Sequence, residues 1–125
     1  MARHAPLPEP MRKALAELFG PGVDGVRITE HSWYARLHVG ASATTRRGCI
    51  FLRGSATEFL GDPELVLHEY FHVLRQWNAG RLTTLAYLWE WVRRGYRNNR
   101  YEVEARAFAT AYAADLRVRL DATGE

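Results

Sequence analysis

The sequence predicts an α+β fold, and three observations support this class. Runs with strand-like alternation lie in the first half of the chain. Segments with helical apolar spacing dominate the second half. The length of 125 residues and the 47% hydrophobic content are typical of a soluble domain that buries a core. We therefore expect a single domain over residues 1–125.

The N-terminal half is expected to hold an arm, a helix and a small sheet. Residues 1–10 contain three prolines and predict an extended N-terminal arm. From Met11, helical apolar spacing predicts a helix that stops at Gly20-Pro21-Gly22. Three short strand-like runs follow, and their turn-like gaps predict a mostly antiparallel three-stranded sheet. The runs occupy residues 26–31, 34–40 and 48–54.

Three helices are expected in the C-terminal half. Asp62-Pro63 supplies an N-cap and a first-turn proline for the first helix, which Gly80 ends. A second helix is predicted over residues 84–94, and a third follows Asn98-Asn99 and continues to about residue 120. An apolar stripe on the first of these helices predicts its buried face; it comprises Val66, Tyr70, Val73, Leu74 and Trp77. Trp77, Tyr87, Trp89 and Trp91 are interpreted as core or interface residues.

The charge does not favour a nucleic-acid partner. The net charge is +3, but the arginines are scattered among acidic and aromatic residues instead of forming one block. An arginine-rich nucleic-acid-binding domain is therefore the least favoured alternative. The chain has no apolar run of transmembrane length, and MARHAPLPEP has no signal-peptide core, so we expect no membrane association. The single Cys49 excludes an internal disulfide and fits a cytoplasmic location.

The segment LHEYFH, residues 67–72, carries the clearest chemical signal. His68 and His72 are four residues apart and share one face of a helix, where they can hold one metal ion. With Glu69 they form the pattern H-E-x-x-H, in which the glutamate acts as general base to a water that zinc activates. The competing interpretation is a helix with two surface histidines, but the match falls on a capped helix. We predict that His68 and His72 bind Zn²⁺.

A catalytic zinc site needs a third protein ligand and an open position. Upstream candidates are His4, His31 and His38. On the last helix, Glu102 lies nearer to the apolar face than Glu104 does. The alternative role for Glu102 is a capping box with Asn99. We predict ligation by Glu102. Gln76, one turn after His72, either orients a ligand or is solvated.

The motif also carries a family resemblance. HEYFH followed by a carboxylate on a later helix resembles the gluzincin branch of zinc metallopeptidases. The segment from Glu102 to Ala109 resembles the E-x-x-A-x-x-F-A signature of ImmA/IrrE-type metalloproteases, whose glutamate is the third zinc ligand. TTRRGCIFLRG before LVLHEYFHVLRQW resembles small toxin-associated metallopeptidase-like domains from bacteria. The resemblance covers roughly residues 44–110 and implies a minimal zincin core whose edge strand lines the cleft.

The expected function is zinc-dependent hydrolysis of a peptide bond in a protein or peptide substrate. His68, His72 and Glu102 are the expected zinc ligands, and Glu69 is the expected general base. The alternative is a catalytically silent zinc-binding module of zincin fold that acts through a protein partner. A donor for the oxyanion is also required. Tyr96, Arg100 and Tyr101 lie near the site in sequence, and the sequence does not rank them.

Overall fold

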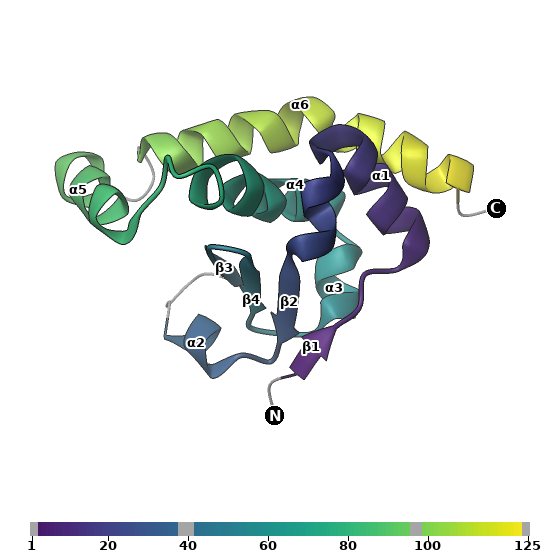
Figure 1. Ribbon diagram of the computed structural model, residues 1–125, viewed down its shortest axis with the longest axis horizontal. Coiled ribbons are helices and arrows are strands. Elements are labelled where there is room, and N and C mark those ends of the chain that lie inside the picture. The colour runs from purple at the N-terminus through teal and green to yellow at the C-terminus, as the bar shows by residue number, and fades with distance from the viewer. Residues whose placement is uncertain (1–2, 38–41, 96–98, 124–125) are drawn as a thin grey trace.

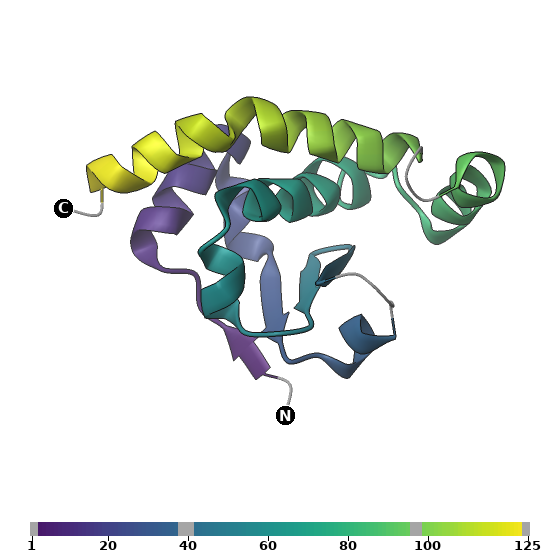
Figure 2. The ribbon, with the colours of Figure 1, turned by 180° about the vertical axis from the view of Figure 1, so that it is seen from behind.

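The structure is a computed structural model that describes residues 3–37, 42–95 and 99–123. It confirms the α+β class, with helices packed on a small mixed sheet. Two views from opposite sides show α4 lying between the sheet and the long C-terminal helix α6 (Figures 1 and 2). The predicted zinc-binding histidines belong to this central helical segment.

The sheet has four strands in the order β1-β2-β4-β3. Its strands are β1 (Arg3–Ala5), β2 (Arg27–Glu30), β3 (Ala43–Arg46) and β4 (Cys49–Leu52). β1 and β2 pair antiparallel, as do β3 and β4, whereas β2 and β4 are parallel. The sheet is thus mostly antiparallel, but the expected number of three strands is wrong. The additional strand β1 lies within the segment predicted to be an extended arm.

The strand predicted over residues 34–40 is also wrong. Its described part falls mainly in a short helix, α2 (Trp33–Arg36), and residues 38–40 lie outside the described ranges. The reason is local: the Ser32 side chain accepts a hydrogen bond from the Tyr34 amide at 3.2 Å and starts a helix. The strand that replaces it is β3, which leads into a tight turn where Gly48 has φ +72°.

The remaining elements of the described chain are helical, and they lie before, within and after the motif. The helical elements before the motif are α1 (Glu9–Phe19), the 3₁₀ turn η1 (Pro21–Gly25) and α3 (Ala56–Leu60), which was not predicted. As predicted, Asp62 caps α4 (Pro63–Phe71) by accepting a hydrogen bond from the Leu65 amide at 3.2 Å. The helix then widens into a π-helical segment, η2 (His72–Trp77). The last two helices are α5 (Thr84–Arg94) and α6 (Arg100–Thr123), close to their predicted bounds.

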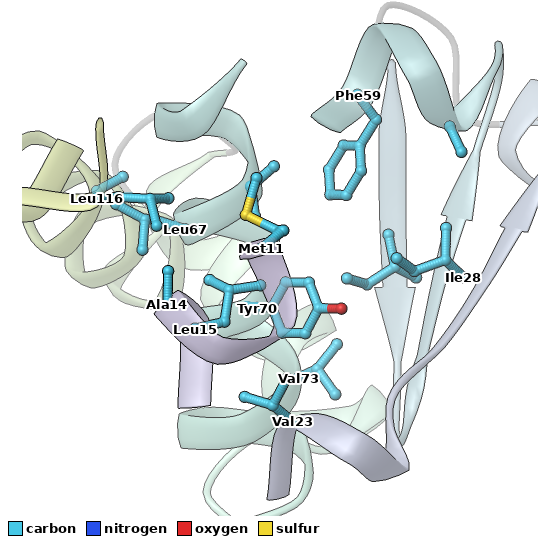
Figure 3. Packing of buried hydrophobic residues seen from close by; sticks show 14 of the residues in the cluster. Met11, Ala14, Leu15, Val23, Ile28, Phe59, Leu67, Tyr70, Val73 and Leu116 are labelled. Atoms are coloured by element: carbon cyan, nitrogen blue, oxygen red, sulfur yellow. The ribbon is translucent and has the colours of Figure 1, made fainter. Parts of the chain in front are cut away.

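The hydrophobic core joins α1, α4, α6 and the sheet. The Tyr70 ring lies among side chains of these elements, with Leu15 and Ile28 close by (Figure 3). Val66, Tyr70 and Val73 are fully buried, which confirms the predicted stripe on α4, although Leu74 is only partly buried. His68 and His72 lie on the side of this helical segment away from the stripe, where they contact Glu102 at the start of α6.

Helix α5 stands apart at one end of the molecule (Figure 1). Its exposed apolar side chains include a helical stripe of Leu85, Leu88, Trp89 and Val92. Trp91 is also exposed, whereas Trp77 is buried in a small cluster with Leu82 and Tyr101, and the partly buried Tyr87 packs against this cluster. The core interpretation therefore does not hold for Trp89 and Trp91. Across the described ranges, no helix has both the length and the apolar character that crossing a membrane requires.

Candidate metal centre

The two histidines of the motif face each other, as their spacing predicts. His68 lies in the last turn of α4, and His72 is the first residue of η2. Their Nε2 atoms are 3.2 Å apart, and their rings meet edge to face. His72 is buried, while the His68 side chain retains 17% of its exposure. The two Nε2 atoms therefore face one common position, and this position is nearest to solvent on the side of His68.

Glu102 reaches this point from the first turn of α6. Its Oε1 atom lies 3.1 Å from His68 Nε2 and 3.2 Å from His72 Nε2. The three candidate ligand atoms all lie within 4.8 Å of one another. Two imidazole nitrogens and one carboxylate oxygen form a donor set that suits Zn²⁺. The residues present therefore fit the metal that the motif predicts.

The capping box is not what the structure shows. Asn99 Oδ1 accepts a hydrogen bond from the Tyr101 amide at 2.8 Å and starts α6 without help from Glu102. The Glu102 carboxylate instead turns towards the histidines. Glu104 does not join them. Among the upstream histidines, His4 contacts Thr29 at 3.1 Å, His31 is exposed, and His38 lies outside the described ranges.

The charges of the site are mutually stabilising. Burial alone would raise the pKa of Glu102, but contacts with His68 and His72 outweigh it and lower that pKa to about 2. Burial opposes the charged form of His72, yet its hydrogen bond to Glu102 and the charges of Glu102 and Glu69 raise its pKa. The Glu102 carboxylate is thus ionised and strongly favours a positive charge beside it.

Glu69 lies beside the ligand set without belonging to it. The residue is buried, and this desolvation raises its pKa, although the charges of His72 and His68 oppose the rise. No residue of the described chain donates a hydrogen bond to its carboxylate, whereas Glu102 is held by both histidines. The Glu69 carboxylate therefore keeps its lone pairs available for a proton, as a general base requires.

A polar network surrounds the far side of His72. Gln76 Oε1 lies 2.7 Å from His72 Nδ1, and Gln76 Nε2 donates to the Tyr101 carbonyl at 3.0 Å. The same nitrogen donates to Glu104 Oε1 at 2.9 Å, and Arg81 donates to Glu104 Oε2 at 2.8 Å. Gln76 is fully buried, so the solvated alternative for this side chain is wrong.

The edge strand β3 borders the same helical segment. Trp77 Nε1 donates to Thr45 Oγ1 at 3.2 Å, and β3 packs on α4 and η2. Of the candidate oxyanion donors, Tyr101 is buried and donates its hydroxyl to the Arg81 carbonyl at 3.2 Å. Arg100 donates to that hydroxyl at 3.0 Å. Tyr96 lies outside the described ranges.

The fold and the site define an α+β domain with a candidate three-residue metal centre. Residues 6–80 match the family model of the eCIS core domain. Because this match covers more than half of the 125 residues, the chain belongs to the eCIS core domain family. No curated protein and no solved structure shows significant similarity to it. The match includes His68, Glu69 and His72 and ends before Glu102, and the resemblance to ImmA/IrrE-type metalloproteases stays a prediction.

Proposed function

We propose that the protein is a zinc-dependent peptidase that cleaves a protein or peptide substrate. The observation that carries the proposal is the convergence of His68 Nε2, His72 Nε2 and Glu102 Oε1 beside the carboxylate of Glu69. Two histidines and a glutamate leave an open position on a four-coordinate metal. A site that served structure alone would need no general base beside it, and Glu69 therefore favours catalysis over a structural role.

Each residue has a separate task in this proposal. His68, His72 and Glu102 would hold the ion, and zinc bound there would supply a Lewis acid that lowers the pKa of a water molecule to about 7. Glu69 would accept a proton from water as the water oxygen forms a bond to the peptide carbonyl carbon. It would then deliver this proton to the amine nitrogen as the C–N bond breaks. Burial of Glu69 helps the first transfer, because a carboxylate with a raised pKa is a stronger base.

Metal content provides the first test. Protein purified without chelator should carry about one zinc per chain, since one three-residue site is proposed. His72→Ala should lose most of this zinc, while the exposed control His31→Ala should keep it. Elemental analysis of the three proteins measures the result. Zinc content that is unchanged in His72→Ala would remove the proposed site.

Hydrolysis provides the second test. Glu69→Gln should keep zinc and fold, because Glu69 is outside the ligand set. Its rate on a peptide library or a denatured protein should fall by about 10²–10⁴-fold, since an amide cannot accept the proton. Cleavage that persists in zinc-loaded Glu69→Gln would show that Glu69 is not the base.

A second candidate function is a zinc-binding module that acts through a protein partner. The observation that favours it is membership of a family named for the extracellular contractile injection system, and not for an enzymatic activity. Zinc-loaded wild type that cleaves nothing in the same library assay would favour this candidate over the peptidase.

A further inference from the structure

Gln76 is a fully buried amide in the π-helical segment η2. A primary amide has one acceptor oxygen and two donor hydrogens, and a buried polar group that lacks a hydrogen-bond partner destabilises the fold. All three capacities of Gln76 meet partners here. His72 Nδ1 faces the oxygen at 2.7 Å, and the Tyr101 carbonyl and Glu104 Oε1 face the nitrogen at 3.0 and 2.9 Å.

The surroundings allow one orientation of this amide. A backbone carbonyl can only accept a hydrogen bond, so the group that faces the Tyr101 carbonyl must be the NH₂ group. Its second hydrogen points to Glu104 Oε1, and Arg81 donates to the other oxygen of that carboxylate at 2.8 Å. The opposite orientation would set the amide oxygen against two acceptors. The oxygen therefore faces His72 and can only accept there.

This orientation decides where His72 carries its proton. A ring nitrogen that meets an acceptor at 2.7 Å must donate, so Nδ1 is the protonated nitrogen. In the neutral imidazole the lone pair then lies on Nε2, the atom that faces His68 and Glu102. We propose that Gln76 is a positioning residue that holds His72 in the tautomer with its Nε2 lone pair in the metal centre. This inference rests on the proposed zinc site.

Gln76 and Glu102 favour opposite positions of the proton on the His72 ring. Without a metal, a carboxylate beside Nε2 attracts a proton to that nitrogen, and a proton there occupies the lone pair that a metal needs. Gln76 counters this preference from the other side of the ring. Without the Gln76 acceptor, the neutral His72 should shift its proton to Nε2 and donate to Glu102.

The same side chain also ties the two ligand-bearing helices together. Its hydrogen bond to the Tyr101 carbonyl fixes the residue next to Glu102 in sequence, at the start of α6. Gln76 belongs to the widened turn of η2, at whose end the Asn78 amide donates to the Val73 carbonyl, five residues earlier, at 2.7 Å. Such π-helical turns are rare in proteins, and those that occur often lie at functional sites. One side chain thus positions a histidine ligand and the turn that carries the carboxylate ligand.

The test is the tautomer of His72, read by ¹⁵N NMR of zinc-free protein at a pH where the ring is neutral. Wild type should show a protonated Nδ1 and an unprotonated Nε2. Gln76→Met keeps the length of the side chain and removes the acceptor, so it should shift the neutral ring towards Nε2–H. Glu104→Gln is the matched control, because its amide oxygen still accepts from Gln76 and the wild-type tautomer should persist. A neutral wild-type ring protonated on Nε2 overturns the inference, even if Gln76→Met does not fold.

Zinc affinity is the second measurement. Outer partners of ligating histidines typically contribute 10–100-fold to metal affinity, so Gln76→Met should bind zinc weaker by about that factor in a chelator competition. Unchanged affinity together with an unchanged tautomer in Gln76→Met overturns the positioning role. Wild type that binds no zinc overturns the proposed function instead, and the tautomer still reports on Gln76 separately.

Discussion

Glu102 Oε1 lies 3.1 Å from His68 Nε2, although 34 residues separate them in the sequence. The contact exists because the start of α6 packs across the end of α4, and the intervening segment includes the whole of α5. The candidate metal centre is therefore a product of tertiary packing as much as of the H-E-x-x-H spacing.

The choice of the third ligand can be tested with two glutamates of α6. Glu102→Gln should weaken zinc binding by at least about tenfold, since it removes the ionised oxygen beside the histidines. Glu104→Gln should bind zinc nearly as well as wild type, because Glu104 contacts Gln76 and Arg81 instead. Chelator competition measures both affinities. Equal affinities would show that Glu102 is not a ligand.

The Tyr70 hydroxyl is buried and has no hydrogen-bond partner among the described residues. The ring itself fills the core, so Tyr70→Phe keeps the packing and removes the unsatisfied oxygen (Figure 3). We expect the free energy of unfolding to rise by about 1 kcal/mol. Urea denaturation measures the change, with Tyr112→Phe on the exposed side of α6 as the control. A loss of stability in Tyr70→Phe would contradict the finding.

Glu30 should make stability depend on pH. Its carboxylate accepts hydrogen bonds from the Ala56 amide at 2.8 Å and from Arg3 at 2.6 Å, and these bonds lower its pKa. Because the folded pKa lies below the unfolded value of about 4.3, the stabilisation is present above that value and is lost as the pH falls through the folded pKa. Glu30→Gln should therefore be less stable than wild type at pH 7, and the difference should shrink in acid. Denaturation at several pH values tests this, and a constant difference would contradict it.

The attachment of α6 to the core depends on buried leucine. Leu116 is fully buried in the core cluster, so Leu116→Ala should lower the free energy of unfolding by about 2–5 kcal/mol. Val118, two residues later, is exposed, and Val118→Ala should change stability by no more than about 0.5 kcal/mol. Thermal or chemical denaturation compares the two variants. Similar losses in both would contradict the packing of α6 seen here.

Local signals were enough to predict much of the helical part of the molecule. α5 begins after Thr83, whose side chain accepts from the Ala86 amide, and it ends at Gly95, as caps and breakers predict. The face shared by His68 and His72 follows from the helical period alone. Glu102 was separated from Glu104 by its angle to the apolar stripe, which the packing of α6 on α4 preserves.

Long-range pairing explains what the sequence could not predict. β1 has three residues, and it is a strand because it pairs with β2 at Arg3 and Glu30, far apart in sequence. α2 was missed because apolar alternation outweighed the short cap at Ser32. The burial of Gln76 depends on the π-helical turn and on α6, and no periodic pattern in the sequence encodes either.

The placement of α5 between the ligands has a consequence for its exposed apolar stripe. The helix lies in the segment between His72 and Glu102, and Glu90 holds its inner face to the start of α6 by accepting from the Arg100 amide at 3.3 Å. An ion held by both ends of this segment would restrict where α5 can stand. Binding of the ion by the metal centre and the position of α5, with its exposed apolar stripe, would then be coupled equilibria. Such coupling is reciprocal. A molecule that bound α5 in its present position would raise the affinity for zinc. Zinc would raise the affinity for that molecule by the same factor.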